Sequence, residues 1–176
     1  SYTNEVLNGD VHTANMKMAG LTDRDQAKTF IYAFMYGAGP EKIGNIVGAG
    51  YQEGEQLINK FLKNMPAMKR VQKNVQDIAL KKNKIKGIDG RFLKIRSPHA
   101  ALNTYIQGAG AVVCKDWLVH MTTRVAQSGL DAKLVASIHD EYQFEVAKKD
   151  VKEFGKITKE AIQYTEKKLN LNCPLD

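Results

Sequence analysis

The sequence predicts an α+β fold in which helices come first and a small antiparallel sheet flanked by helices follows. Helical segments are predicted over most of residues 22–80, whereas two short runs within residues 133–146 alternate as strands do. Helices and strands that are segregated along the chain are typical of α+β proteins. The length of 176 residues is that of one domain, or of part of a larger one.

The first predicted helix covers residues 22–36. Thr22 can cap its start with a hydroxyl, and Asp23 and Asp25 place negative charge in the first turn, where the helix dipole favours it. The Gly-Ala-Gly-Pro sequence at residues 37–40 then ends the helix.

Two further helical stretches are predicted at residues 41–47 and 52–80, and the second is interrupted near Pro66. Residues 85–95 predict a hairpin, because the Asp-Gly pair at residues 89–90 can supply the positive φ angles of a tight turn.

The last third of the chain combines one long helix with strands and a closing helix. Ser-Pro at residues 97–98 is a capping residue followed by a first-turn proline, which predicts a helix over residues 99–127. Residues 133–138 and 142–146 then alternate as two strands, and a final amphipathic helix is expected over residues 150–169.

The net charge of +7 is concentrated in one segment, residues 60–96, which we call the basic belt. The belt carries +10 and the rest of the chain −3. Such focused charge favours a polyanionic partner, nucleic acid before membrane, because the large apolar residues of an interfacial helix are not interleaved with it. A lysine-rich face that is simply solvated would account for the charge as well. The belt contains Lys60, Lys63, Lys69, Arg70, Lys73, Lys81, Lys82, Lys84, Lys86, Arg91, Lys94 and Arg96.

Several other classes of protein are disfavoured. No run approaches the roughly 18 apolar residues of a membrane span. Cys114 and Cys173 lie far apart and form no Cys-x-x-Cys motif, so neither a disulfide framework nor a zinc knuckle is predicted. No basic-then-apolar signal segment opens the sequence, so a reducing, intracellular setting is expected. The chain begins with Ser1 in place of Met and is expected to be a fragment.

One face of the helix at residues 22–36 carries side chains suited to a nucleotide. An arginine fork and a lysine point charge suit phosphates, and two tyrosines offer flat faces to a sugar or a base. These residues recur every four positions: Arg24, Lys28, Tyr32 and Tyr36. The predicted core face lies about a third of a turn away and consists of Ala27, Phe30, Ile31 and Phe34. A solvated amphipathic helix is the alternative.

His139, Asp140 and Glu141 separate the two predicted strands and would form the tight turn of a hairpin. Asp140 would point outward there and could hold a divalent cation, because Mg²⁺ bound to a triphosphate needs oxygen ligands with open positions. An ordinary surface turn is the alternative. His-Asp also belongs to a metal phosphohydrolase signature, but that class places the pair on a helix, whereas the flanking residues here alternate as strands do.

Two amides one helical turn apart, Asn103 and Gln107, could donate hydrogen bonds to acceptor atoms in the minor groove of DNA. Gly108 and Gly110 follow within the same predicted helix, at a cost of about 1 kcal/mol each relative to alanine. Close approach of another helix or of a nucleic-acid backbone would account for this cost.

Residues 24–37, with the sequence RDQAKTFIYAFMYG, closely resemble motif B of the family A (polymerase I-like) DNA polymerases. The phrases GDVHT at residues 9–13, RSPHAALNT at residues 96–104 and IHDE at residues 138–141 are similar to those of the replicative polymerases of short-tailed bacteriophages. The resemblance covers the whole chain. It implies template-directed DNA synthesis in DNA replication, by nucleotidyl transfer from a deoxynucleoside triphosphate to a primer 3′-hydroxyl.

The resemblance also implies part of a right-hand polymerase fold, with a fingers subdomain over residues 1–80 and a palm subdomain over residues 81–176. The nucleotide-binding helix would belong to the fingers, and the hairpin around Asp140 to the palm. Primer-template DNA and deoxynucleoside triphosphates would be the partners, with a processivity factor possible for the longer enzyme. The setting would be the cytoplasm, in an infected bacterial host if a phage encodes the protein.

Roles for the nucleotide-binding residues follow from the resemblance. Arg24 and Lys28 would hold the triphosphate, and Lys28 would be a catalytic proton donor to the departing pyrophosphate. Tyr32 would lie against the sugar, where other members carry Phe, and Tyr36 would pack at the nascent base pair. His12 would reach a phosphate.

DNA-binding and metal-binding residues are implied in the same way. The residues implied to contact DNA are Arg96, His99, Asn103, Gln107 and His139. Asp140 would be catalytic by binding two Mg²⁺ ions, and Glu141 would support that metal site. The second metal-binding carboxylate belongs to the family's motif A, which has no match in these 176 residues, so we expect no synthesis from them alone. A non-catalytic DNA-binding module is the alternative.

Overall fold

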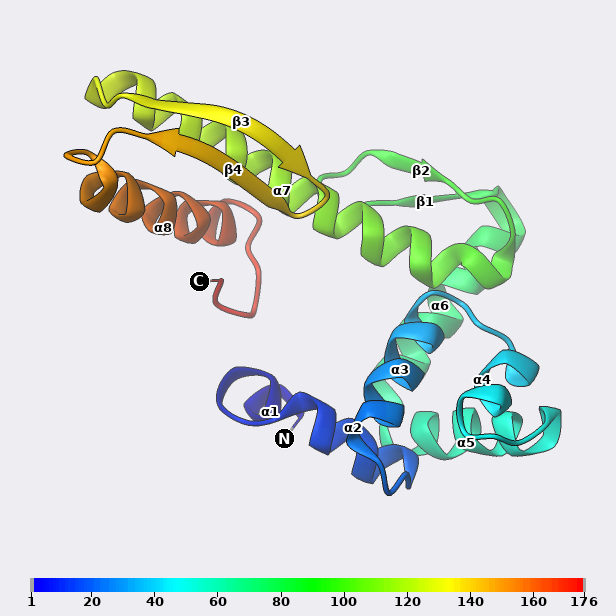
Figure 1. Ribbon diagram of the computed structural model, residues 1–176. Coiled ribbons are helices and arrows are strands. Elements are labelled where there is room, and N and C mark those ends of the chain that lie inside the picture. The colour runs from blue at the N-terminus through cyan, green and yellow to red at the C-terminus, as the bar shows by residue number, and fades with distance from the viewer. Residues whose placement is uncertain (1, 176) are drawn as a thin grey trace. The chain divides into compact units, whose positions relative to one another are not determined.

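The computed structural model describes residues 2–175, except for the side chain of Thr3. The described chain divides into two compact units, Ser1–Lys86 with Phe92–Ile106 (unit 1) and Gly87–Arg91 with Gln107–Asp176 (unit 2). The elements follow one another in this order (Figure 1): α1 (Tyr2–Asn8), α2 (Val11–Ala19), α3 (Arg24–Met35), α4 (Pro40–Ile46), α5 (Tyr51–Asn64), α6 (Pro66–Lys82), β1 (Lys84–Lys86), β2 (Phe92–Lys94), the 3₁₀ turn η1 (Pro98–Ala100), α7 (Ala101–Ser128), β3 (Ala132–Ile138), β4 (Glu141–Val146) and α8 (Val151–Lys168).

The core of unit 1 is built around α3. Phe30 and Phe34 point inward from α3 and pack edge-on against Phe61 of α5, with ring centroids 5.2 and 5.4 Å apart, a favourable aromatic geometry. The predicted inward face of α3 is confirmed, since Ala27, Phe30, Ile31 and Phe34 are all buried.

The start of α3 differs from the prediction. Asp23, not Thr22, is the N-cap, and its carboxylate accepts a hydrogen bond of 2.8 Å from the backbone N–H of Gln26. An ionised carboxylate at the N-cap also interacts favourably with the positive end of the helix dipole, which explains why it takes this place.

Two short helices, α1 and α2, precede α3 and were not predicted. Asp10 caps α2 by accepting hydrogen bonds from the backbone N–H groups of His12 and Thr13, and Gly20 ends the helix at a φ of 75°. That backbone conformation suits glycine. These helices depend on caps and on packing within unit 1, because segments of this length are marginal alone.

The predicted break at Pro66 is confirmed, because α5 ends at Asn64 and α6 begins at Pro66. Glycine permits the close packing of α4 on α5. A side chain at Gly54 would collide with the carbonyl oxygen of Pro40, and one at Gly44 with that of Gly50.

The hairpin of β1 and β2 is confirmed as antiparallel, but its turn differs from the prediction. Residues 87–91 form a loop in place of a two-residue turn, with Gly90 at a φ of 85° and Asp89 not among the residues with positive φ. Asp89 accepts a hydrogen bond from the backbone N–H of Arg91, which fixes the loop locally.

The long predicted helix begins two residues late. Pro98 opens a 3₁₀ turn, and α7 starts at Ala101. Ser97 makes no capping hydrogen bond through its side chain, so the predicted cap is wrong although the proline stands in the first turn as expected.

Unit 2 packs one face of a two-stranded sheet on two helices. Met121 and Val125 of α7 and Ile157 and Ala161 of α8 form its buried centre, against which Phe144 of β4 packs. Side-chain contacts join the two helices as well: Trp117 Nε1 donates to the carbonyl of Thr158 at 3.0 Å, Arg124 pairs with Glu160 at 2.6 Å, and Lys168 pairs with Asp116.

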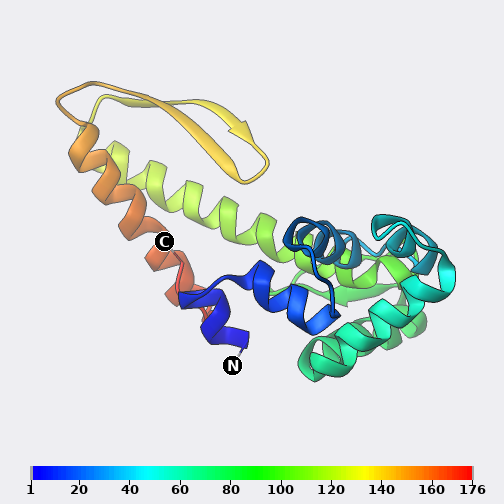
Figure 2. The same cartoon turned by 60° about the horizontal axis from the view of Figure 1, so that its bottom comes forward.

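The predicted strands are confirmed as the antiparallel hairpin of β3 and β4, with a register irregularity between Leu134 and Ala136. Within the described residues β3 pairs with β4 alone, and Figure 2 shows this hairpin as a two-stranded ribbon. The outer side of β3 stays exposed at Leu134, Val135 and Ile138. The irregularity breaks the strict alternation that the sequence predicts, since Leu134 and Ile138 were expected on one side with Ala136.

None of the helices within residues 2–175 combines the length and the apolar character needed to cross a lipid bilayer.

Candidate functional site

The outward face of α3 presents the predicted stripe. Arg24 and Lys28 are exposed, and Tyr32 and Tyr36 keep 47% and 58% of their surface in solvent. Exposed tyrosines on a helix whose opposite face is fully buried are available to a ligand. The sidedness predicted for this helix is therefore confirmed.

Asp10 holds Arg24 by two hydrogen bonds, from Nε to Oδ2 at 2.8 Å and from Nη2 to Oδ1 at 3.1 Å. The guanidinium, together with the Thr13 hydroxyl, holds the pKa of the Asp10 carboxyl well below its usual range, and Asp10 in turn raises the pKa of Arg24. Because the carboxyl pKa is depressed in the folded protein, the ion pair stabilises the fold at every pH above the usual carboxyl pKa. This stabilisation is lost as the pH falls through the depressed pKa. The pair therefore persists at neutral and mildly acidic pH.

His12 stands in the first turn of α2, beside Tyr32 of α3. The centroids of the two rings are 6.3 Å apart. Nδ1 of His12 is buried and has no hydrogen-bond partner among the described residues. Unpaired buried polar atoms are uncommon in native structures. The His12 ring therefore lies beside the exposed face of α3, with Nδ1 unpaired within the described part of the chain.

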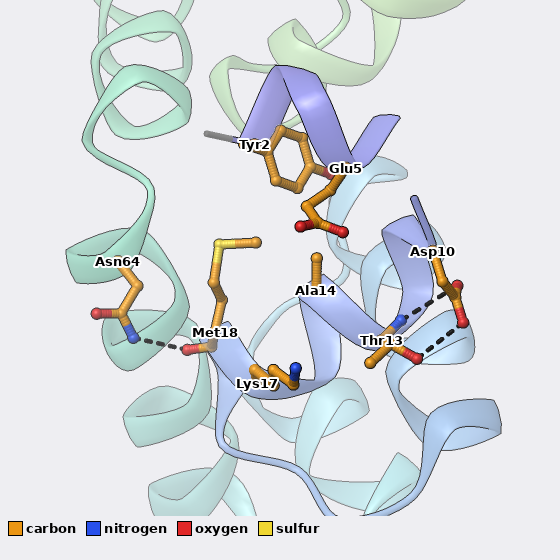
Figure 3. A pocket seen from close by; sticks show the side chains of 8 residues that line it. All are labelled: Tyr2, Glu5, Asp10, Thr13, Ala14, Lys17, Met18 and Asn64. Carbon is orange, nitrogen blue, oxygen red and sulfur yellow. Dashed lines mark hydrogen bonds between the residues drawn. The ribbon is translucent and has the colours of Figure 1, made fainter. Parts of the chain in front are cut away.

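A pocket of about 410 Å³ lies beside α2. Figure 3 shows Asp10 and Thr13 on its wall, joined by a hydrogen bond of 2.8 Å from the Thr13 hydroxyl. Across the pocket, Asn64 of α5 donates to the carbonyl of Met18 at 2.8 Å and ties α5 to the end of α2.

A second pocket, of about 510 Å³, lies at the C-terminal end of α3. Gly37 and His99 both line it, and a side chain at Gly37 would come within 3.1 Å of the His99 carbonyl oxygen. Gly37 has a φ of 81°, so glycine is required there by conformation as well as by space. The structure thus brings His99 next to the residue that follows Tyr36.

The turn between β3 and β4 carries the predicted acidic pair. His139 adopts a φ of 55°, the left-handed conformation of a tight hairpin turn, and Asp140 and Glu141 are exposed after it. Gln143 donates a hydrogen bond of 2.8 Å to Glu141, which orients that carboxylate. The strands on both sides agree with the sequence argument against the helical His-Asp signature of metal phosphohydrolases.

Cys114 of α7 lies near this turn and was not singled out from the sequence. Burial raises the pKa of its thiol, and the charge of Asp140 raises it further. Burial also raises the pKa of the Tyr142 phenol, with a smaller effect of Cys114. Cys114 and Tyr142 are thus partly buried, whereas Asp140 is exposed.

Metal binding would need ligands beyond these residues. Within residues 2–175, no group of three or more His, Cys, Asp and Glu side chains is arranged to hold a metal ion. Asp140 and Glu141 supply oxygen atoms of the kind that Mg²⁺ prefers, but too few to complete its coordination.

The basic belt extends over α5, α6, β1 and β2, and most of its cations are exposed. Lys84 and Lys94 are direct cross-strand partners in the β1–β2 ladder, a like-charge pair that destabilises a sheet. Lys60 differs from the rest, because a side chain at Gly20 would collide with its ammonium group. This lysine lies against the C-terminal end of α2, where a cation is favourable.

The two amides lie on α7, where Asn103 is half-buried and Gln107 exposed. A side chain at Gly110 would meet no atom of the described chain within 4 Å. Packing against another helix of the described chain therefore does not explain the cost of this glycine.

The predicted residues fall into both units. His12, Arg24, Lys28, Tyr32, Tyr36, Arg96, His99 and Asn103 belong to unit 1, and Gln107, His139, Asp140 and Glu141 belong to unit 2. Sequence reasoning missed Asp10 and Cys114. Asp10 carried a recognisable signal, because aspartate is among the residues most favoured at an N-cap. Cys114 carried none.

Comparisons with known proteins agree with these findings. The family model "DNA polymerase family A" matches residues 6–176. The DNA-directed DNA polymerase of Enterobacteria phage T3 is 41% identical over 196 aligned residues, and that of Escherichia phage T7 is 40% identical over the same length. Each comparison covers 99% of this chain and 28% of the phage protein, so the chain spans little more than a quarter of these relatives.

More distant matches also cover most of this chain. DNA polymerase I of Streptococcus pneumoniae is 24% identical over 187 residues, covering 94% of this chain and 21% of that protein. A solved structure described as the POL domain of Pol1 from M. smegmatis in complex with DNA primer-template and dNTP matches with a TM-score of 0.84 at 19% identity. It covers 93% of this chain and 33% of that one.

The α+β architecture matches that of a polymerase domain, and the resemblance to bacteriophage polymerases is confirmed along nearly the whole length. The family model itself leaves out only the first five residues. The chain belongs to DNA polymerase family A.

Proposed function

We propose that this chain supplies the nucleotide-binding helix and one catalytic carboxylate of an enzyme that synthesises DNA on a template. The observation that carries the proposal is the outward face of α3, where Arg24, Lys28, Tyr32 and Tyr36 are exposed while the opposite face is buried. Residues 1–80 would act as fingers and residues 81–176 as palm. The family membership supports this assignment.

The triphosphate of the incoming nucleotide binds at Arg24 and Lys28, and His12 contacts a phosphate from α2. Arginine suits the planar oxygens of a phosphate, and lysine adds a mobile point charge. Tyr32 lies against the sugar and Tyr36 against the nascent base pair. Support comes from the Pol1 structure of M. smegmatis, which was solved with DNA primer-template and dNTP.

The reaction is an in-line attack of the primer 3′-hydroxyl oxygen on the α-phosphorus atom of the nucleotide. One O–P bond forms, the bond to pyrophosphate breaks, and the hydroxyl proton leaves to solvent. Lys28 donates a proton to the departing pyrophosphate, as a general acid. His139 lies near the primer terminus.

Asp140 would hold the catalytic Mg²⁺ ions, and Glu141, to which Gln143 donates a hydrogen bond, would support the same site. Bound Mg²⁺ would neutralise charge that develops on the attacking and leaving oxygens. Because Asp140 and Glu141 provide too few oxygens, the nucleotide's phosphates, water and a second carboxylate outside these 176 residues must complete the coordination.

Template-primer DNA runs along the basic belt and the start of α7. The belt contacts phosphates without reading sequence, whereas Asn103 and Gln107 donate to minor-groove acceptors that all base pairs share. Arg96 and His99 join them from the segment before α7. A processivity factor would bind the longer enzyme, which would act in the cytoplasm of an infected bacterium.

The proposal can be tested by measuring single-nucleotide incorporation with a full-length polymerase that contains these residues. Lys28→Ala should slow incorporation by about a hundredfold or more, the usual contribution of a general acid. Lys42→Ala is the matched control, because Lys42 is also exposed in unit 1 but stands on α4, off the stripe. Equal rates for Lys28→Ala and the wild type would contradict the assignment.

A DNA-binding module without catalysis is the second candidate, and the basic belt favours it because duplex binding needs no nucleotide site. Dialysis with a labelled nucleotide separates the candidates: a polymerase segment retains it through the α3 stripe, and a binding module does not. Primer extension with the 176 residues alone gives a further check. Robust synthesis by them would contradict the need for a second carboxylate.

A further inference from the structure

Asp10 contacts both helices of the candidate nucleotide-binding face. Its carboxylate caps α2 and at the same time pairs with the first residue of α3. Each of its two oxygens accepts more than one hydrogen bond. The donors are His12 N at 3.0 Å, Thr13 N at 3.3 Å, Thr13 Oγ1 at 2.8 Å, Arg24 Nε at 2.8 Å and Arg24 Nη2 at 3.1 Å.

Arg24 is held by one edge of its guanidinium. Nε and Nη2 donate to Asp10, whereas Nη1 has no hydrogen-bond partner among the described residues. A guanidinium has five N–H groups, so the edge that faces away from Asp10 keeps donors for a phosphate. The side chain of Arg24 is 50% exposed, which leaves that edge within reach of a ligand.

The same carboxylate fixes His12. The backbone N–H of His12 donates to Asp10, and this bond sets the start of α2 on which the imidazole is mounted. The His12 ring in turn lies beside Tyr32. Asp10 thereby fixes two phosphate-binding candidates relative to each other across α2 and α3.

We propose that Asp10 is a positioning residue for the incoming nucleotide, which orients the Arg24 guanidinium and the His12 backbone so that both face one triphosphate. The proposal rests on the proposed function of the α3 stripe. Asp10 acts through Arg24 and His12 and touches no reacting atom.

A competing role would be that of a stand-in for phosphate, with Asp10 released from Arg24 when the nucleotide arrives. The contacts argue against a movement of Asp10, because its displacement would also break the cap of α2. A carboxylate that accepts five hydrogen bonds has few lone-pair sites left and little freedom to move. The two roles predict opposite changes in nucleotide affinity when the charge is removed.

Asp10→Asn separates these roles in the complete polymerase. Asparagine caps a helix about as well as aspartate, so α2 keeps its start, but the amide cannot accept from Arg24 at both positions. The KM for the nucleotide should rise roughly two- to tenfold, since a free arginine must be ordered on binding. The kcat and the melting temperature should change little, because exposed ion pairs contribute little to stability.

Asp23→Asn is the matched control. Asp23 also caps a helix, carries the same charge and stands next to Arg24 in sequence, but makes no hydrogen bond to it. The KM of the Asp23→Asn variant for the nucleotide should stay at the wild-type value. Thr13→Val is a milder variant that keeps the Asp10 charge and removes one of its hydrogen bonds, and it should raise KM in the same direction by less.

Arg24→Ala and the double variant Asp10→Asn/Arg24→Ala complete the test. If Asp10 acts mainly through Arg24, the KM of the double variant should be no more than about twofold above that of Arg24→Ala. A lower KM for Asp10→Asn, or fully additive effects, would overturn the positioning role. An unchanged KM for Arg24→Ala would instead remove the proposed function of Arg24, and the two failures are therefore distinguishable.

Discussion

The rings of His12 and Tyr32 lie side by side in a tilted arrangement, with centroids 6.3 Å apart and planes at 48°, and so bring the first turn of α2 next to the middle of the exposed face of α3. The phenol of Tyr32 is thereby held on one side while 47% of the side chain stays in solvent. The sugar contact proposed for Tyr32 can therefore be tested by removing the hydroxyl oxygen alone while the ring stays beside His12.

Tyr32→Phe removes the hydroxyl and keeps the ring. We expect the variant to accept 2′,3′-dideoxynucleotides about tenfold less well than the wild type, because a hydroxyl that can replace the missing 3′-OH hydrogen bond is lost. Competition between a dideoxynucleotide and its deoxynucleotide on one primer gives the ratio. Tyr51→Phe, at an exposed tyrosine of α5, is the control, and an unchanged ratio for Tyr32→Phe would refute the contact.

Asp140→Asn should reduce nucleotide incorporation by about a thousandfold or more, since stabilisation of transition-state charge by metal is worth several kcal/mol. Duplex binding, measured by fluorescence anisotropy, should stay within about threefold of the wild-type affinity. Glu145→Gln removes a similar exposed carboxylate from β4 and should leave both unaffected. Wild-type incorporation by Asp140→Asn would overturn the metal assignment.

Lys94→Gln should have opposite effects on stability and on DNA binding. It relieves the like-charge pair with Lys84 across β1 and β2, so the melting temperature should rise slightly. It also removes one phosphate contact, so the slope of log affinity against log salt should become shallower by about 0.9. Lys42→Gln, outside the belt, should leave that slope unchanged, and an unaltered slope for Lys94→Gln would argue for a merely solvated lysine.

Gly110→Ala should stabilise α7 by about 1 kcal/mol, because the added methyl group meets no described atom. If DNA approaches this helix, the same methyl group should weaken duplex affinity severalfold. Gly155→Ala is the matched control on α8, where the space is equally open and a helical glycine is replaced in the same way. Equal DNA affinity for both variants would remove the case for DNA contact at Gly110.

The parts of the fold that rest on periodicity could be predicted from the sequence. The inward face of α3 follows from the spacing of Ala27, Phe30, Ile31 and Phe34, and all four are buried. The β3–β4 hairpin follows from alternation around His139. The helical spacing on α3 extends over several turns, and the alternation in β3 and β4 extends over several residues. In each case the local preference for helix or strand agrees with the pattern of burial.

The remaining features depend on contacts that local sequence does not reveal. Helix α2 needs the Asp10 cap and its packing on α3, and Asp10 reaches Arg24 across 14 positions. The irregularity after Leu134 shifts β3 by one residue and moves apolar side chains to solvent, which period-2 reasoning cannot anticipate. The effect of the Asp140 charge on the pKa of Cys114 likewise depends on a tertiary arrangement, since the two residues are far apart in sequence.

The uncovered side of β3 has a consequence for handling the isolated chain. Among residues 2–175, one edge of β3 has no partner strand, and Leu134, Val135 and Ile138 of this strand are exposed, so a second copy can add a strand there. Concentrated solutions of the 176 residues should therefore self-associate through this edge and scatter light. Val135→Lys places a charge at an exposed position outside the hairpin's packed face, and should keep the chain dispersed without loosening β3 from β4.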